Sequence, residues 1–168
     1  RLFGSTAMIN ALEELGYVAD ASYPIYFYRD RLTPYHPSRE DWTKEGNLRL
    51  LELPNFADLS MPSADPYGRD RDQWPLFRTE SAGALMRHVD GFVGYCGAAG
   101  VEPFLCFYLH PWEFCEMPQG ELRVGEGTVR PDPFIVKNCG PYAAAQLEAL
   151  IAALQARGGR FYQARQVA

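Results

Sequence analysis

The chain has 168 residues, of which 47% belong to the hydrophobic set and 22% are charged, proportions ordinary for one soluble globular domain with a buried core. No apolar run approaches the roughly 20 residues that span a bilayer, so we expect no membrane partner. The net charge of -5, without a cluster of Lys or Arg, argues against nucleic acid as a partner, because nucleic-acid binders concentrate positive charge on one face.

The first predicted element is an amphipathic helix over residues 5–15. Ser5 is a good N-cap, apolar residues follow at helical spacing, and Gly16 supplies the C-terminal stop. Residues 17–20 are predicted to form a short strand. The next segment, residues 24–47, is rich in tyrosine, proline and charge and has no sustained period, which predicts a long surface excursion.

The middle of the chain is predicted to contain a strand, a loop and a helix. Residues 48–53 alternate weakly and stop at Pro54, as in a strand whose ladder a proline ends. Residues 58–75 contain several prolines and a run of alternating charges, which predicts a solvated loop. Thr79 is then expected to cap a helix that ends at Gly100.

The last third contains the longest apolar run, residues 104–109, flanked by two prolines. Such a run is typical of a strand covered on both faces. After a connection rich in Gly and Pro, a helix is predicted from Pro141 to Gly158, and a short strand over residues 160–163. Helices and strands alternate along the whole chain, which predicts an α/β fold with parallel strands joined by helices.

Several common catalytic motifs are missing from the sequence. There is no Gly-x-Ser-x-Gly elbow, no phosphate loop and no dinucleotide fingerprint, which argues against the usual serine hydrolases, kinases and nicotinamide enzymes. The four cysteines lie far apart without a Cys-x-x-Cys pair, so we expect small buried residues rather than a zinc knuckle or disulfides. Neither the cysteines nor the start at Arg1 fixes the compartment, and cytoplasmic and secreted locations both stay open.

Residues 108–113, Tyr-Leu-His-Pro-Trp-Glu, are the most informative stretch for chemistry. Residues just past the carboxyl ends of parallel strands point into the ligand crevice of such folds. Because Pro111 interrupts a strand ladder, we predict that the imidazole of His110 emerges at a strand tip, facing a concave site. The alternative is a structural histidine satisfied within the fold, and we interpret His36 and His88 as surface or loop residues.

Aromatic side chains cluster between Tyr23 and Trp42. Flat apolar faces with polar tips suit sugar rings, but Tyr and Trp also cover cores, and the cluster fits both roles. Asp20, at the end of a predicted strand, either caps a turn or orients a functional group.

Several short segments occur in an order that has a counterpart in a known family. They read Arg1-Leu-Phe-Gly4, Leu15-Gly16-Tyr17, Asp20-Ala-Ser-Tyr-Pro24, Pro34-Tyr-His-Pro-Ser38, Leu50-Leu-Glu-Leu-Pro54, His110-Pro-Trp-Glu113 and Gly158-Gly159-Arg160-Phe161. In this order they resemble the C-terminal part of the polysaccharide deacetylase family, the NodB-homology metal-dependent amide hydrolases. The resemblance covers nearly the whole chain.

The resemblance implies an irregular (β/α) barrel with parallel strands inside and helices outside, of which residues 1–168 would form the second half as the C-terminal portion of a single domain. It implies removal of N-acetyl or O-acetyl groups from an oligo- or polysaccharide by water activated on a divalent metal, zinc or similar. The metal ligands, an Asp and a His-x-x-x-His pair, are then expected upstream of Arg1. This portion alone would bind no metal and would be inactive.

Within this chain, the resemblance makes His110 the general acid that protonates the leaving amine. Tyr108, Leu109, Trp112 and Asp20 are then expected on the substrate side of the site. Two alternatives stay open: a hydrolase of a non-sugar C–N bond on the same fold, and a non-catalytic carbohydrate-binding or scaffold domain. An Asp-Asp pair and a His-x-x-x-His motif upstream would favour catalysis over the binding module.

Overall fold

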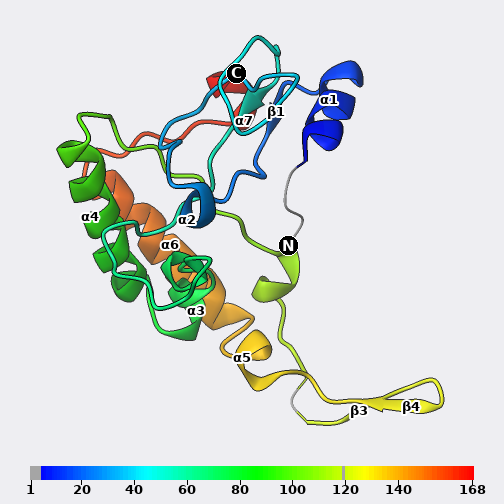
Figure 1. The fold of residues 1–168 in the computed structure, drawn as a ribbon. Helices are drawn as coiled ribbons and strands as arrows, with labels where there is room; N and C mark the ends of the chain where they lie inside the picture. Colours follow the sequence, from blue (N-terminus) through cyan, green and yellow to red (C-terminus); the bar gives the residue numbers. More distant parts are fainter. Residues whose placement is uncertain (1–4, 119) are drawn as a thin grey trace. The chain divides into compact units, whose positions relative to one another are not determined.

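The computed structural model describes residues 5–118 and 120–168. The chain forms two compact units, which are described separately below (Figure 1). The first unit consists of the chain up to Gln73 together with His88–Phe107 and Arg160–Ala168, and the second consists of Trp74–Arg87 and Tyr108–Gly159. The described residues form two small sheets of two strands each, one parallel and one antiparallel, and neither is closed. The barrel therefore stays a prediction.

The first helix forms as the sequence predicts. Helix α1 spans Thr6–Glu14, and the Ser5 side chain accepts a hydrogen bond from the backbone N–H of Met8 at 3.2 Å. Gly16 adopts a left-handed φ of 79°, which ends the helix. On the inner face of α1, Ile9 is fully buried in the first unit. Local signals of capping and spacing were sufficient here.

The parallel sheet of the first unit is short and carries a carboxylate at the end of each strand. Strand β1 (Ala19–Asp20) pairs with β2 (Leu51–Glu52), with Asp20 opposite Glu52. Both strands are shorter than the sequence predicts. Because carboxyl ends of parallel strands meet at one edge, the two acidic side chains lie side by side there.

The segment predicted as a surface excursion is largely irregular and exposed, as expected, but it also contributes aromatic side chains to the core, which the sequence did not predict. It contains helix α2 (Ile25–Tyr28), and the rings of Tyr35 and Trp42 are buried against Tyr23, each with centroids 5.6 Å from it. Packing of this kind leaves no period in the sequence, since each aromatic side chain comes from an irregular stretch of backbone.

The helix of the central region starts later than predicted. Helix α3 (Leu76–Thr79) ends at Thr79, so this residue does not cap the long helix. Helix α4 spans Ala82–Ala98, and Ser81 Oγ accepts from the backbone N–H of Ala84 at 3.1 Å. The preceding loop contains one short 3-10 helix, η1 (Arg69–Arg71), as expected for a proline-rich connection.

The apolar run at 104–109 does not form a strand, which corrects the sequence prediction. Its residues are half-buried, and Leu109 is 38% exposed, so the run is not covered on both faces. A backbone hydrogen bond from Phe56 N to Cys106 O, 2.9 Å long, links residues 104–107 to the rest of the first unit. A strand needs a neighbouring ladder as well as apolar residues.

The second unit is mostly helical, with one hairpin. The 3-10 helix η2 (Pro111–Phe114) is followed by the antiparallel strands β3 (Leu122–Val124) and β4 (Gly127–Val129). The short helix α5 (Pro133–Val136) and the predicted long helix α6 (Pro141–Ala156) complete it. The predicted last strand, 160–163, is irregular and leads into α7 (Ala164–Val167) of the first unit.

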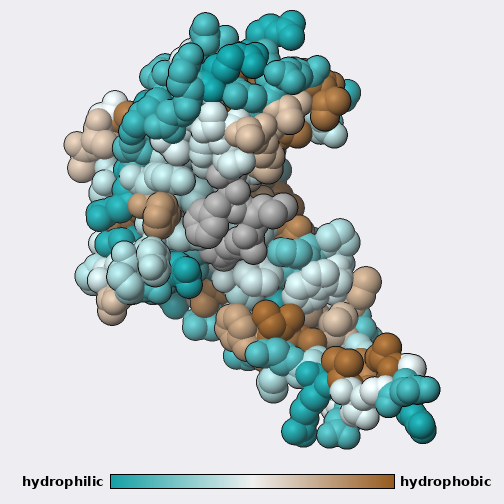
Figure 2. Space-filling model, turned by 45° about the vertical axis from the view of Figure 1, so that its right-hand side comes forward, coloured by the Kyte–Doolittle hydropathy of each residue, from teal (hydrophilic) through white to brown (hydrophobic). Residues whose placement is uncertain are grey.

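Hydrophobic side chains are exposed on the hairpin. Figure 2 shows brown atoms gathered over β3 and β4, where Val124 and Val129 are 62% and 52% exposed. None of the helices in the described part of the chain has the length and apolarity required to cross a membrane.

Candidate active site around His110

His110 stands immediately before η2, in the second unit, with an extended backbone. Pro111 begins the 3-10 helix, so the chain turns at the histidine, as the sequence predicts, although no strand precedes it. The side chain is 44% exposed. Its ring is flanked by three aromatic rings, those of Trp74, Trp112 and Tyr108, with centroid separations of 5.1, 5.5 and 6.0 Å.

A buried carboxylate lies behind the imidazole. Glu113 is 0% exposed, and its Oε2 accepts from the backbone N–H of His110 at 2.7 Å and from Trp74 Nε1 at 3.2 Å. The same oxygen lies 3.6 Å from His110 Nδ1, a buried nitrogen with no closer polar partner in the described residues. A carboxylate on this side favours a proton on Nδ1 and leaves Nε2 as the nitrogen that can exchange a proton.

An arginine fixes the carboxylate in turn. Arg78, from α3, is 0% exposed and donates from Nε to Glu113 Oε1 at 2.8 Å. Its other nitrogens donate to the backbone carbonyls of Lys137 and Ile135 at 2.5 and 2.7 Å. The guanidinium also lies over the rings of two tryptophans, 5.9 Å from Trp74 and 5.4 Å from Trp112. The positive charge of Arg78 therefore balances the negative charge of Glu113, and the bonds to the two carbonyls hold the guanidinium in place.

The predicted site residues divide between the two units. His110, Tyr108 and Trp112 come together in the second unit, where Tyr108 stacks on Trp74 with centroids 5.6 Å apart and an interplanar angle of 27°. Leu109 is exposed beside them. Asp20 belongs to the first unit, at the end of β1, where it faces Glu52 rather than capping a turn.

Sequence reasoning missed Trp74 and Arg78. Arg78 pairs with a glutamate 35 residues later, and no local spacing indicates such a partner. The one available signal was a charged residue inside the apolar Leu76-Phe-Arg stretch of a helix, since such residues are buried only when paired. The bond from the His110 backbone N–H to Glu113 supports the turn at this point.

The second carboxyl group of interest is in the first unit. Glu52 is fully buried, and its Oε1 accepts from the backbone N–H groups of Ser22 and Tyr23, both at 2.8 Å. Glu52 Oε2 and Asp20 Oδ2 are buried without a donor from the described residues. Burial first, and then the charge of Asp20, raise the pKa of Glu52 to about 8.

The other two histidines differ from one another. His36 is exposed, as predicted, with Nδ1 3.2 Å from the carbonyl of Leu50. His88 is half-buried on α4 and pairs through Nδ1 with Asp58 at 2.9 Å. The interpretation of His88 as a surface residue was therefore wrong, because Asp58, itself 3% exposed, lies in a loop far away in sequence.

A divalent metal does not fit the residues around His110. Glu113 offers the nearest carboxylate, and three N–H donors already occupy its oxygens. Across residues 5–118 and 120–168, no group of three or more His, Cys, Asp or Glu side chains is placed to hold a metal ion.

Comparison of the chain with protein-family models, with curated proteins and with solved structures gives no match.

Proposed function

We propose that the chain is the C-terminal portion of a hydrolase of the polysaccharide deacetylase type, which removes acetyl groups from an N-acetylated glycan, with His110 as the proton donor. The observation that carries the proposal is the chain of contacts from Arg78 through Glu113 to His110. It holds one face of a half-exposed imidazole against a buried carboxylate. The resemblance of residues 110–113 to the last catalytic motif of that family supports the same role.

The chemistry assigned to this chain is proton transfer. In amide hydrolysis the leaving amine must be protonated as the C–N bond breaks, and an imidazolium supplies that proton efficiently near neutral pH. Glu113 stabilises the cationic ring from the Nδ1 side, which directs Nε2 toward the substrate. Glu113 is thus a positioning residue, and Arg78 holds it in place through the bond to Oε1.

The aromatic rings would restrict water around this transfer. Trp74, Tyr108 and Trp112 surround the imidazole, and aromatic walls with a few polar groups are typical of sites that bind small ligands or sugars. Leu109 and Asp20 remain proposed substrate-side residues.

The test is acetate release from N-acetylated chitooligosaccharides by the natural protein that contains this sequence, assayed with zinc. We expect His110→Ala to lower kcat by about 10²- to 10⁴-fold, the usual contribution of a positioned acid. His36→Ala is the matched control, because His36 is an exposed histidine of the first unit, and it should keep full turnover.

Three results would contradict the proposal in different ways. A His110→Ala protein with unchanged kcat would remove the catalytic role of the histidine. Turnover of non-sugar amides without acetate release from glycans would favour the amide hydrolase. Glycan binding without any turnover by the unmodified natural protein would favour a non-catalytic carbohydrate-binding domain.

A further inference from the structure

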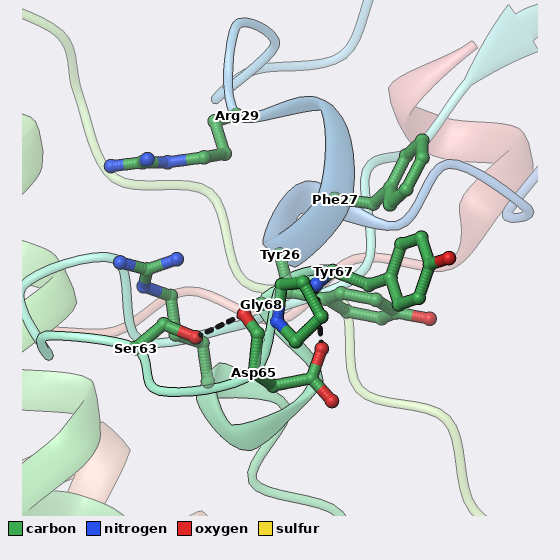
Figure 3. A pocket seen from close by; sticks show the side chains of 9 residues that line it. Tyr26, Phe27, Arg29, Ser63, Asp65, Tyr67 and Gly68 are labelled. Carbon is green, nitrogen blue, oxygen red and sulfur yellow. Dashed lines mark hydrogen bonds between the residues drawn. The ribbon is translucent and has the colours of Figure 1, made fainter.

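A cavity of about 360 Å³ opens in the first unit, between α2 and the turn that leads into η1. Figure 3 shows Phe27 and Tyr67 on one side of it and Arg29 on the other. The cavity has no part in the site around His110, since all the residues that line it belong to the first unit. Its lining includes Phe27, Arg29, Asp65, Tyr67, Gly68 and Arg71.

Two guanidinium groups, those of Arg29 and Arg71, line this cavity. Arg71 is only 9% exposed, and its Nε donates to the carbonyl of Met61 at 2.9 Å. Within the described residues, neither Arg71 nor Arg29 takes part in an ion pair. A buried charge is costly when it has no counter-charge, so this cavity favours an anionic group.

Two exposed aromatic rings form the opposite wall. Phe27 and Tyr67 stack with centroids 6.2 Å apart and an interplanar angle of 23°, although they are 40% and 53% exposed. Arg69 does not line the cavity, but its guanidinium lies 4.9 Å from the Tyr67 ring centroid. Exposed aromatic groups beside guanidinium groups suit a ligand with both an apolar ring surface and a negative charge.

A carboxylate acceptor distinguishes this site from one for a simple anion. Asp65 lines the cavity and accepts through Oδ1 from the backbone N–H of Tyr67 at 2.6 Å. A carboxylate of this kind accepts hydrogen bonds from the hydroxyl groups of a ligand. The neighbouring Asp70 is occupied by Ser63 Oγ at 2.5 Å and by the backbone N–H of Ala64 at 2.9 Å.

The backbone around the cavity is specialised at two residues. Gly68 has a φ of 72°, and a Cβ atom there would lie 2.5 Å from the carbonyl oxygen of Tyr26. Arg29 has a φ of 66°, in the left-handed region that Gly or Asn usually occupies, at the end of α2. These conformations bring the loop of residues 63–68 against the end of α2 and present Arg29 to the cavity (Figure 3).

We propose that this cavity binds a carboxylate-bearing sugar residue of the uronate type. Arg29 and Arg71 bind the carboxylate, the wall of Phe27 and Tyr67 contacts the ring, and Asp65 accepts from the hydroxyl groups. Binding by itself is independent of the reaction at His110. The further conclusion, that the glycan processed by this protein is acidic, rests on the proposed function.

The test is calorimetric titration of the 168-residue chain with D-glucuronate, D-glucose, D-glucose 6-phosphate and acetate. We expect millimolar affinity for glucuronate and at least about tenfold weaker binding of each of the other three compounds. Acetate lacks the sugar ring, glucose lacks the charge, and glucose 6-phosphate lacks the planar carboxylate. The Arg29→Gln substitution should weaken the binding of glucuronate by about tenfold and leave the binding of glucose unchanged. Arg39→Gln is the matched control, since Arg39 pairs with Glu14 on the surface at 3.3 Å, away from the cavity.

Two results would overturn the proposal. One is the absence of glucuronate binding at concentrations of about 50 mM, more than tenfold above the expected dissociation constant. The other is acetate or glucose 6-phosphate binding as tightly as glucuronate, which would indicate an anion site without a sugar. Either result leaves the role of His110 intact, because no turnover is measured, and loss of that role would leave glucuronate binding unaffected.

Discussion

Each of the two units buries one glutamate completely, and the two side chains have opposite surroundings. Glu113 receives three N–H donors, including the guanidinium of Arg78. Glu52 faces a second carboxyl group, that of Asp20, and two backbone N–H groups. Both are 0% exposed, so burial does not distinguish them.

The comparison shows that the partner decides what a buried carboxyl group can do. Beside a guanidinium, a carboxylate keeps its charge and can hold an imidazolium in place. Beside another carboxyl group, burial and the neighbouring charge raise the pKa of Glu52 to about 8, and the pair holds a proton at neutral pH. In the first unit, Glu52 and Asp20 therefore share a proton at neutral pH. In the second unit, Glu113 is bonded to Arg78 and lies behind the imidazole of His110.

The largest expected effect comes from removing the cation. Arg78→Met should lower the free energy of unfolding by about 3–5 kcal/mol, because Glu113 would be buried without a counter-charge. Urea denaturation at pH 7 measures the change. Arg123→Met, on the exposed hairpin, is the matched control and should change the value by less than about 0.5 kcal/mol.

A double variant separates charge from packing. If the unpaired charge causes the loss, Arg78→Met combined with Glu113→Gln should recover part of the stability lost in Arg78→Met alone. A double variant that is less stable than Arg78→Met would show that packing of the glutamate, rather than its charge, dominates.

The second prediction concerns the pH dependence of the first unit. Because the pKa of folded Glu52 lies near 8, above the ordinary value of 4.5, its protonation stabilises the fold fully below pH 4.5. This contribution is lost as pH rises toward 8, at up to about 1.4 kcal/mol for each pH unit. Glu52→Gln keeps an uncharged side chain, so its stability should change less between pH 5 and 8.

Chemical denaturation at several pH values measures this difference. Glu102→Gln, at a surface position whose side chain is 84% exposed, should keep the pH profile of the unmodified chain. Parallel profiles for the unmodified chain and Glu52→Gln would contradict the protonated pair.

The sequence predicted those features that depend on neighbouring residues. Ser5 and Gly16 mark the ends of α1, and Pro141 marks the start of α6, because capping and proline effects act within a few residues. The turn at His110 followed from Pro111 in the same way. In each case the local backbone preference and the fold agree.

The sequence did not predict features that depend on distant partners. Within the described residues, the run at 104–109 pairs with no neighbouring strand and forms none itself, although its residues favour one. Tyr35 and Trp42 are core residues because they pack around Tyr23, and their spacing carries no period. Arg78 could not be assigned to Glu113 from sequence, since salt bridges between distant elements depend on the folded geometry.

A smaller effect is expected from changing the partner of Glu52. Asp20→Asn removes the charge that contributes to the raised pKa of Glu52, but burial, the larger cause, remains. The midpoint of the pH-dependent stability loss should therefore move to lower pH by about one unit without reaching the ordinary value. Denaturation profiles from pH 5 to 9 measure it, and an unchanged midpoint would exclude Asp20 as a contributor.

The smallest effect is expected at a thiol beside Glu52. Burial first, and then the charge of Glu52, raise the pKa of Cys106 to about 11, which suppresses its thiolate. Cys115, in the second unit, is exposed, and iodoacetamide should modify it far faster than Cys106.

Above pH 9, where Glu52 is ionised, Glu52→Gln should raise the rate of Cys106 modification by about two- to fivefold. At pH 7 Glu52 is mainly protonated, so the same variant should change the rate much less. Peptide mapping by mass spectrometry follows both thiols in one experiment, and Cys115 serves as the internal control. An equal acceleration at both pH values would mean that the substitution loosens packing around Cys106, which would remove this evidence for a proton held between Asp20 and Glu52.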